Sequence, residues 1–551
     1  MLSYRKLAMR VLGRPLHTEG ISSPHPASQR AAAFILTAAM LTTLAAPAFA
    51  DIWHIEDGDI TVKASGTEGK NTVSQGNKKD VEDTNTIITN RDKNTASSHT
   101  VTIEAGNDKV EVTLKDVNIK ADSGSALTSK GDVTLTLKGD NHLTGGISDN
   151  GNYGLSGISS SGSLTISGGE TDSLTAQGGS GTDGSGGRGI FSKDLTISGG
   201  TVNANGGDGK NGSGGSGITS LGSVTISGGS TVTANGGSGT ISGGDGICSS
   251  GGVTISGGST VTANGGNGGS LVGGDGIRSG GGLTVSDGTV TAQGGHGDRT
   301  DGYGGDGIRS GGGVTISGNT VNAAGGNSGK VGGYGICSFD RVAISGGAVT
   351  ANGGDGGSGG GSGIYSSDID LSGSLELTAK AGSPNGKALS RAGYELDLDA
   401  IKDKLGPGAK VTATDADGKV NQVSIPGPVE PEKPVIPEES SSSSDGGSSA
   451  PSAPASPLPG LTVTDKDGAV ISYTSTQSGN TLTVCVGRFT ASLRASLSAL
   501  RQLRAEGIET ITFQTILCST TLSVDELLAM GGEDAEAVLT HRLTDSSLTV
   551  G

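Results

Sequence analysis

The fold of this 551-residue chain is decided by a stretch that reads Val224-Thr-Ile-Ser-Gly-Gly-Ser-Thr-Val-Thr-Ala-Asn-Gly-Gly237, then a Gly/Ser loop, then Gly244-Asp-Gly-Ile-Cys-Ser249. A further copy of the same pattern follows at once. The copies recur every 27 to 31 residues, and they begin at Leu164, Leu195, Val224, Val253, Leu283, Val314, Val342 and, in degenerate form, near Ile369. A fixed period in this range predicts a solenoid.

Each copy contains three short pieces in which apolar and polar residues alternate, such as Val253-Thr-Ile255, Thr260-Val-Thr-Ala263 and Gly276-Ile-Arg278. This period of two places valine, isoleucine and alanine on one face and threonine on the other. Gly pairs separate the pieces, and Gly inside a helix costs about 1 kcal/mol relative to Ala. Because one coil cannot bury its apolar face, neighbouring coils must stack about 4.8 Å apart in parallel register. The sequence therefore predicts a mainly β chain that forms a right-handed parallel β-helix.

An amide side chain precedes the Gly pair in most copies. Asn205, Asn235, Asn264 and Asn352 hold this position, and Gln holds it in two other copies. Stacked coils would place these groups above one another, where each amide can donate to one neighbour and accept from the other. The sequence thus predicts an amide ladder. The alternative, which is compatible with it, is that Asn before Gly serves as a turn residue.

Composition and charge narrow the classes of partner. The net charge is −17 and aromatic residues make up 3% of the chain. An acidic chain without Lys/Arg clusters is a poor candidate for binding nucleic acid or anionic membranes. The chain has no CxxC motif or His/Cys cluster in its sequence, which disfavours a structural zinc site. Cys248 and Cys337 lie three coils apart, roughly 14 Å, too far to bridge, whereas Cys485 and Cys518 could pair.

The first 50 residues resemble an export signal, with basic residues, an apolar run from Ala31 to Leu44 and the small-x-small site Ala48-Phe49-Ala50. We expect a secreted or extracellular protein, held non-covalently if it stays at the cell surface, with no membrane insertion in the mature form. The predicted divisions are a signal peptide at 1–50, a β-helix at 51–425 with Gly-rich repeats at about 158–380 and a C-terminal cap at 384–424, a Pro/Ser-rich linker at 426–460, and a small α/β domain at 461–551.

Local patterns add detail at the two ends of the β-helix and in the last domain. Trp53, the only Trp, is expected to cap the N-terminal end, while residues 70–94 are polar and predict a surface loop. Residues 398–405 have helical spacing and could close the other end. In the last domain, residues 492–506 predict an amphipathic helix. Strands are expected at 481–486 and 510–514, and Ser523 is expected to cap a short helix.

One charged column is a candidate site. Asp245, Asp275 and Asp306 each stand in Gly-Gly-Asp-Gly-Ile, at one position of three successive coils. Two carboxylates at about 4.8 Å repel by roughly 1 kcal/mol in water and by more near a low-dielectric surface, so a compensating cation is expected. Ca²⁺ suits such an oxygen-rich column. Two alternatives stay open: Arg278 and Arg309 offset the charge instead, or the aspartates are solvated turn residues.

Sequence signatures of catalysis are weak. Gly209-Lys210 and Gly329-Lys330 lack the Ser/Thr that a phosphate-binding Walker loop requires, and neither GxSxG nor HExxH occurs. The aspartate column with Arg278 has some likeness to a β-helical polysaccharide lyase, but no repeat departs from the consensus as a catalytic coil normally must. Phe191, Tyr303, Tyr334 and Tyr365 sit at different repeat offsets and predict no aromatic stripe. We therefore expect a chain that is not an enzyme.

The N-terminal coils carry a family resemblance. The segments Val112-Thr-Leu-Lys-Asp-Val-Asn-Ile119, Ser125-Ala-Leu127 and Val133-Thr-Leu-Thr-Leu-Lys-Gly139 resemble the carbohydrate-binding right-handed parallel β-helix family of secreted clostridial-type bacterial proteins. The resemblance covers roughly residues 55–380. It implies bound calcium and affinity for cellulose or acidic plant polysaccharide, without placing individual ligands.

The functional prediction follows from the export signal, the solenoid and this resemblance. We expect a secreted, non-catalytic β-helix that binds plant or cell-surface polysaccharide, with calcium assisting through Asp245, Asp275 and Asp306. The alternative is a structural or adhesive surface rod that displays the C-terminal domain. A β-helical polysaccharide lyase is the third reading.

Overall fold

The computed structural model describes residues 52–427, apart from 68 and 298–300. It also describes residues 460–550, apart from 466, 467, 472, 479, 487, 489, 516–518, 531–534, 543 and 544. The chain divides into two compact units, Met1–Glu432 and Lys433–Gly551. The predicted signal peptide at 1–50 and most of the predicted linker at 426–460 lie outside the described residues.

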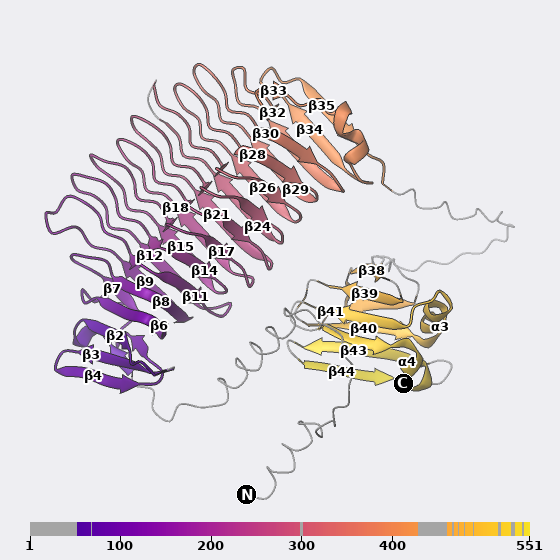
Figure 1. Cartoon of the computed structure of the whole chain (residues 1–551), viewed down its shortest axis with the longest axis horizontal. Helices are drawn as coiled ribbons and strands as arrows, with labels where there is room; N and C mark the ends of the chain where they lie inside the picture. Colours follow the sequence, from indigo (N-terminus) through magenta and orange to yellow (C-terminus); the bar gives the residue numbers. More distant parts are fainter. Residues whose placement is uncertain are drawn as a thin grey trace, which may run out of the picture. The chain divides into compact units, whose positions relative to one another are not determined.

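The first unit is a right-handed parallel β-helix, as the repeat predicts (Figure 1). Each Gly-rich coil contributes three strands to three columns, and the first two columns belong to one large sheet. The first column comprises β10 (Ile158–Ser160), β13 (Ile190–Ser192), β16 (Ile218–Ser220), β19 (Ile247–Ser249), β22 (Ile277–Ser279), β25 (Ile308–Ser310), the beginnings of β28 (Ile336–Ile344) and β30 (Ile364–Leu371), and β32 (Leu389–Arg391).

The second column continues the same sheet, and the third column forms a separate sheet of 12 strands. The second comprises β11 (Ser163–Ser167), β14 (Asp194–Ile197), β17 (Val224–Ile226), β20 (Val253–Ile255), β23 (Leu283–Val285), β26 (Val314–Ile316) and the ends of β28 and β30. The third comprises β7 (Asn118–Lys120), β9 (Asp140–Thr144), β12 (Ser173–Gln177), β15 (Thr201–Asn205), β18 (Thr231–Asn235), β21 (Ser259–Asn264), β24 (Gly288–Gln293), β27 (Thr320–Ala324), β29 (Gly347–Asn352), β31 (Leu375–Lys380), β34 (Lys410–Thr414) and β35 (Val420–Ser424).

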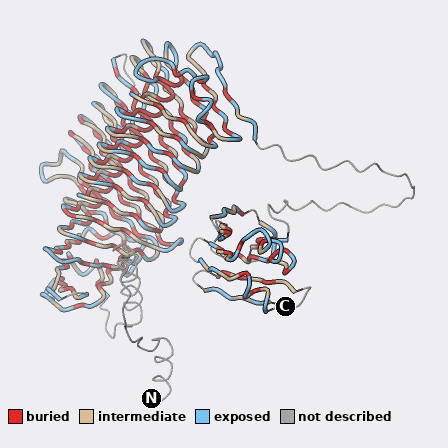
Figure 2. Tube along the Cα trace, turned by 45° about the vertical axis from the view of Figure 1, so that its right-hand side comes forward, coloured by how far each residue is buried: buried red, intermediate tan, exposed pale blue. Residues whose placement is uncertain are grey.

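Successive coils stack in register. Val232 pairs with Val261 and Asn235 with Asn264, so equivalent residues lie above one another. The apolar member of each alternating pair points inward and is fully buried, as Val224, Val232 and Ile247 show. Figure 2 shows buried residues, in red, recurring along the stacked coils. Burying a Val or Ile side chain contributes about 1.5–3 kcal/mol, and the contribution repeats in every coil.

The Gly-rich loops hold many of the 103 glycines of the chain. Each loop doubles back on itself and also pairs with the loops above and below, for example Gly239 with Gly268. A Cβ on Gly265 would lie 1.9 Å from the carbonyl oxygen of Gly274 in the same loop. Real Cβ atoms do not approach backbone that closely, so this layer of packed backbone requires glycine.

Both ends of the β-helix are covered. The N-terminal end is built from β1 (Ile52–His54), η1 (Ile55–Asp57), β2 (Ile60–Ala64), β3 (Asn71–Gln75), β4 (Lys78–Asp83), β5 (Ile87–Thr89), β6 (Val101–Lys115) and β8 (Leu127–Lys138). Trp53 is buried there, and its Nε1–H donates to Asp83 Oδ2 at 2.9 Å. The surface loop predicted at 70–94 is wrong, because β3 and β4 form antiparallel hairpins in this stretch.

At the C-terminal end, β33 (Tyr394–Glu395) and η2 (Asp399–Lys404) follow the last coil, and β35 returns antiparallel to β34. The helical spacing at 398–405 therefore yields a short 3₁₀ helix, in which Ile401 is buried. An antiparallel last strand ends the parallel stack and uses the backbone groups that would otherwise face a further coil.

Within its described residues, the second unit contains two sheets and two helices. Its elements are β36 (Leu461–Thr464), β37 (Val470–Ile471), β38 (Thr474–Ser478), β39 (Thr481–Cys485), β40 (Thr490–Ser496), α3 (Leu497–Ala505), β41 (Thr510–Gln514), β42 (Ser519–Ser523), α4 (Val524–Met530), β43 (Glu536–Arg542) and β44 (Asp545–Val550). The sheet orders are β37-β36-β40-β43-β44 and β38-β39-β41-β42. Cys518 lies outside the described residues, so its pairing with Cys485 stays a prediction.

The helix predicted at 492–506 begins later than expected. Residues up to Ser496 belong to β40, where Ala491, Leu493 and Ala495 alternate inward against β36 and β43. Helix α3 starts at Leu497, and Ser496 Oγ accepts the Ala499 N–H at 3.2 Å. The strand pattern and the helix pattern share neighbouring leucines, so the sequence period alone misplaced the boundary. At α4, Ser523 Oγ accepts the Glu526 N–H as predicted, at 3.4 Å.

Candidate functional site

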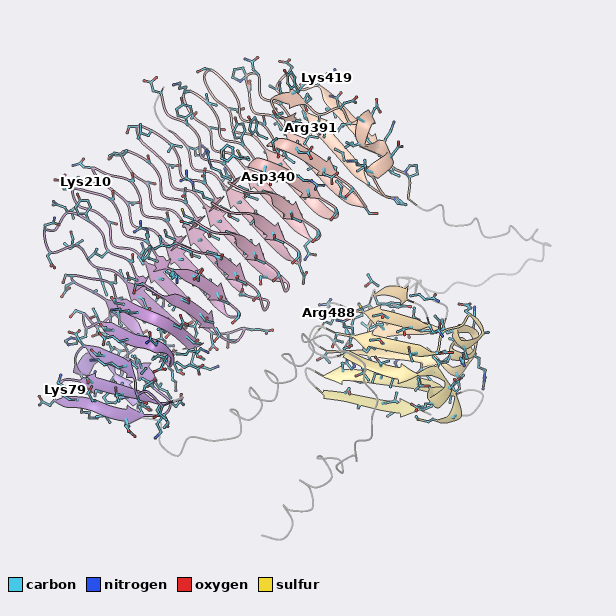
Figure 3. The ribbon with its side chains drawn as sticks, in the orientation of Figure 1. Lys79, Lys210, Asp340, Arg391, Lys419 and Arg488 are labelled. Carbon is cyan, nitrogen blue, oxygen red and sulfur yellow. The ribbon has the colours of Figure 1, made fainter. Side chains whose placement is uncertain are left out.

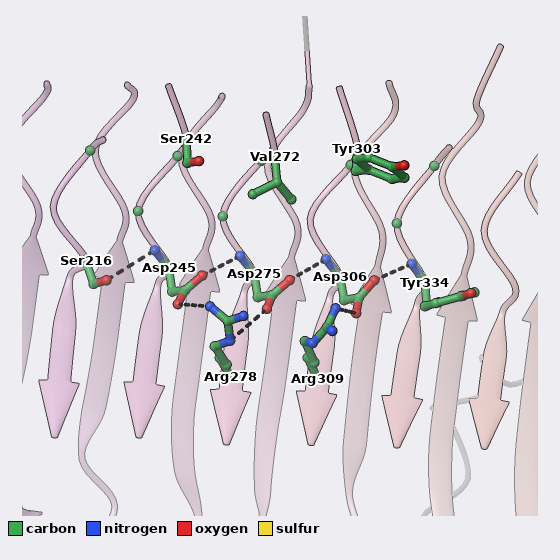
Figure 4. A pocket seen from close by; sticks show the side chains of 18 of the residues that line it. Ser216, Ser242, Asp245, Val272, Asp275, Arg278, Tyr303, Asp306, Arg309 and Tyr334 are labelled. Atoms are coloured by element: carbon green, nitrogen blue, oxygen red, sulfur yellow. Dashed lines mark hydrogen bonds and ion pairs between the residues drawn. The ribbon is translucent and has the colours of Figure 1, made fainter. Parts of the chain in front are cut away.

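The three predicted aspartates form a continuous column at the turn that leads into the first strand of each coil (Figure 4). Asp245 Oδ1 accepts the backbone N–H of Asp275 at 2.8 Å, and Asp275 Oδ1 accepts that of Asp306 at 2.7 Å. Asp306 Oδ1 accepts the Tyr334 N–H at 2.7 Å, and Ser216 Oγ accepts the Asp245 N–H at the other end. Each side chain therefore satisfies a backbone donor of the next coil, which binds the coils together.

The second oxygen of each carboxylate faces an arginine. Arg278, on β22, lies between two coils, with Nη1 3.5 Å from Asp245 Oδ2 and Nε 3.6 Å from Asp275 Oδ2. Arg309, on β25, places Nη1 3.3 Å from Asp306 Oδ2. The aspartates are only 3–8% exposed, whereas the side chains of Arg278 and Arg309 are 50% and 37% exposed. The arginines thus offset the buried charge and still present part of their guanidinium groups to solvent.

Burial dominates the electrostatics of the column. It raises the pKa of Asp306 to about 6, against the favourable hydrogen bond from Tyr334 and the charge of Arg309. Burial, with the neighbouring charges of Asp306 and Asp245, raises the pKa of Asp275 well above its usual value. Ionising a carboxyl costs more free energy wherever like charges share a poorly solvated site.

The column lines a surface groove of about 490 Å³ that spans neighbouring coils. Tyr303, 45% exposed, stands on one wall beside Val272 (Figure 4), and the Lys330 ammonium lies 4.9 Å from the Tyr303 ring centre. Tyr334 closes one end and stacks on Tyr365 with ring centres 4.9 Å apart. The floor thus consists of carboxylates and guanidinium groups, and the walls supply apolar and aromatic surface.

Sequence reasoning identified the aspartates and arginines, and it considered the tyrosines but did not predict that they would meet in the groove. Tyr334 occupies the aspartate position of its coil, and Tyr365 occupies the arginine position of the next. These offsets differ by three residues within a repeat, so no stripe is visible in the sequence. The two rings nevertheless stack, because adjacent coils lie close together and each tyrosine side chain is long enough to cross the offset between the two positions. A search for aromatics at neighbouring column positions of adjacent coils would have found the pair.

Two cysteines flank the arginines in the first column, with Cys248 before Arg278 and Cys337 after Arg309. Burial, together with nearby aspartate charge, raises the pKa of each thiol to about 12. Such thiols stay protonated at neutral pH and are poor nucleophiles. They act as small packing residues, and equivalent positions three coils apart cannot be bridged.

The donor set does not match a calcium shell. One oxygen of each aspartate accepts a backbone N–H and the other faces a guanidinium, so the oxygens already have partners with positive character. Among the described residues, no group of three or more His, Cys, Asp or Glu side chains is placed to hold a metal ion. Of the explanations that the sequence left open, the geometry favours charge compensation by arginine. Calcium binding stays a prediction.

The predicted amide ladder forms over three coils. Asn235 Nδ2 donates to Asn205 Oδ1, and Asn264 Nδ2 donates to Asn235 Oδ1, both at 2.8 Å. Asn352 stands in the same column, but its in-register neighbours are Ala324 and Lys380. The role of Asn352 as a rung of the ladder is therefore lost, because neither neighbour supplies an amide.

A second groove of about 490 Å³ lies near the C-terminal end of the β-helix. Its charged groups pair with one another: Arg391 contacts Asp368 at 2.9 Å, and Lys404 contacts Asp370 at 3.1 Å. Arg341 also pairs with Asp370. These ion pairs fix the cap to the last coils, and the arrangement has a structural explanation without a ligand.

Comparison with known proteins identified no relative of this chain. None of the helices within the described ranges is long and apolar enough to cross a membrane. No family model, curated protein or solved structure matches the chain.

Proposed function

We propose that this chain is an extracellular, non-catalytic polysaccharide-binding protein, and that the groove over the aspartate column is its binding site. The single observation that carries the proposal is the convergence of Arg278, Arg309 and Tyr303 on one groove of about 490 Å³. This volume falls within the range of roughly 300–1,000 Å³ that is typical of small-ligand sites. The export-type segment at 1–50 and the family resemblance support the extracellular setting.

The chemistry of the groove suits sugar hydroxyls. The half-exposed guanidinium groups of Arg278 and Arg309 keep N–H donors on the solvent side, and the aspartates hold the two groups in place. Fixed donors lose little conformational freedom on binding, and hydrogen bonds from a charged donor contribute about 1.5–3 kcal/mol. The exposed ring of Tyr303 offers an apolar face with a polar edge, which is the kind of surface on which a sugar ring packs.

The groove crosses the coils that carry Asp245, Asp275 and Asp306, so it runs along the axis of the β-helix. Three coils extend over about 14 Å. An elongated ligand such as a polysaccharide segment fits this shape better than a compact metabolite. Because three aspartates face the two arginines, the floor of the groove has no excess of positive charge and does not select strongly for an anionic sugar.

The test is retention of the full chain on a panel of immobilised plant and bacterial polysaccharides, with and without EDTA. We expect Arg278→Ala and Tyr303→Ala each to weaken retention about tenfold or more, as the loss of one charged hydrogen bond or one packed ring implies. Arg188→Ala and Tyr153→Ala are matched controls, since both side chains are exposed outside the groove.

Unchanged retention in both groove variants would refute the site, and absence of retention on every glycan would refute the function. Release of unsaturated oligosaccharides would favour the lyase reading instead. The alternative function as a structural or adhesive rod is supported by a separate observation, because the coils stack in register over a long, regular face.

A further inference from the structure

Between β12 and β29, the outer face of the third column carries no charged side chain. On each of the seven strands from β12 to β29, three side chains point outward, and they align in register from strand to strand. In the two central coils they are Thr231, Thr233, Asn235 and Thr260, Thr262, Asn264. Every one of the 21 positions holds Ser, Thr, Asn, Gln or Ala.

Charge returns at both borders of this plane. Asp140 on β9 aligns with its first strand, and Glu376 and Lys380 on β31 align with its last. Charged residues make up 17% of the chain, a share that would place about three or four at 21 positions. Figure 3 shows charged side chains such as Lys210 and Arg391 on the loops and near the ends. Solubility alone does not account for a neutral plane on a chain of net charge −17.

A neutral hydroxyl and amide plane is complementary to a copy of itself. Thr and Asn side chains both donate and accept hydrogen bonds, so the same surface serves on both partners of a two-fold contact. The coil spacing of about 4.8 Å is identical in the two copies, and regular sheets bearing such side chains pack face to face with little space between them. The chain carries a net charge of −17, so repulsion between two copies is smallest where the facing surfaces carry no charge, as on this plane.

The size of the plane sets the strength of the contact. Five residues along a strand extend about 16 Å, and seven strands side by side extend about 34 Å. The footprint is therefore about 550 Å² on each copy, or about 1,100 Å² in total, near the lower limit for a specific interface. This area predicts reversible, concentration-dependent pairing rather than a permanent dimer.

We propose that two copies of this chain associate laterally through the neutral Thr/Asn plane of strands β12 to β29. The proposal is independent of polysaccharide binding, because the plane lies on the third column and the groove lies at the turn before the first. Lateral pairing would present two grooves on one particle, and linked sites of this kind strengthen attachment to a polymer without any new contact.

The test is sedimentation of the full chain at low and high concentration, for the parent and for two double variants. Thr233→Glu with Thr262→Glu places two charges in the plane, on side chains that neighbour each other in register. Thr225→Glu with Thr254→Glu makes the same change in the same two coils, on the outward face of the second column. We expect the first pair to weaken association about tenfold or more, since like charges oppose each other across the contact, and the second pair to leave it unchanged.

Misfolding of the plane variant is separable from loss of the contact. Charge repulsion is screened by salt, so high ionic strength should partly restore association of a correctly folded variant, whereas a misfolded one would not recover. A parent chain that stays monomeric at high concentration would overturn the proposal, as would equal effects of the two double variants. Loss of polysaccharide retention in the plane variant, with a monomeric parent, would instead assign the plane to a glycan surface. Arg278→Ala should leave association unchanged, which distinguishes this proposal from the groove.

Discussion

Replacing Asp306 by asparagine should change how stability depends on pH. Burial raises the pKa of Asp306 from its usual 3.8 to about 6 in the folded chain. A carboxyl whose pKa is higher when folded stabilises the fold while it is protonated, and this contribution is lost as the pH rises from about 4 through about 6. The difference corresponds to about 3 kcal/mol at neutral pH.

The Asp306→Asn variant keeps an oxygen that can accept the Tyr334 N–H and removes the charge. Arg309 loses its partner, but its part-exposed guanidinium stays solvated, and its favourable effect is already contained in the pKa of about 6. Relative to the parent, the variant should therefore gain about 2–3 kcal/mol between pH 4 and pH 7.5. The easier ionisation of Asp275 in the absence of its charged neighbour acts in the same direction.

Urea unfolding followed by circular dichroism at the two pH values measures this double difference. Asp208→Asn is the matched control, because Asp208 is exposed and its carboxylate makes the same kind of contact, accepting the Ser238 N–H at 2.8 Å. If Asp306→Asn and Asp208→Asn shift with pH in parallel, or if Asp306→Asn gains nothing at pH 7.5, the aspartate column is not a source of electrostatic strain and the reasoning is wrong.

Three further outcomes test the architecture and the charge balance. Asn235→Ala should lower the free energy of unfolding by about 1–2 kcal/mol in urea titration, since it removes the bonds that Asn235 makes with Asn205 and Asn264 and leaves both amides without this partner. Gly265→Ala should reduce stability by more than about 3 kcal/mol or prevent soluble expression, because its Cβ would meet Gly274 backbone, whereas Gly359→Ala, with open space around it, should be tolerated in the same thermal melt. EDTA should leave polysaccharide retention unchanged if the arginines balance the column, and retention that depends on added calcium in the same assay would revive the calcium prediction.

Much of the β-helix could be predicted from the sequence because its information is local and repeated. The alternation in Thr260-Val-Thr-Ala263 sets which side chains point inward, and the period of about 29 residues sets which residues stack. Once register is assigned, the aspartate column and the amide column follow by counting. The failure of Asn352 to join the ladder follows in the same way, since Ala324 and Lys380 are its neighbours.

The prediction was weaker where two patterns overlap or where no repeat guides the reading. Leu493 fits the apolar face of a helix that includes the following leucines, and it also fits the inward alternation of β40. Pairing of β40 with β36 and β43 stabilises the strand at this position. Residues 70–94 are polar, yet β3 and β4 form hairpins there, because backbone pairing and the buried partner of Trp53 stabilise them. Tertiary partners outweigh local composition in both cases.

The sequence by itself determined the solenoid, its register and the alignment of Asp245, Asp275 and Asp306, because a repeated pattern fixes which residues lie above one another. Only the tertiary structure decided what these aspartates do. Their oxygens bind the next coil and hold Arg278 and Arg309, and the turn before the first strand opens into a groove with Tyr303 on its wall. The physical reason is that hydrogen-bond partners, burial and the shape of a groove depend on side-chain directions and loop paths between coils, which no spacing along the chain specifies.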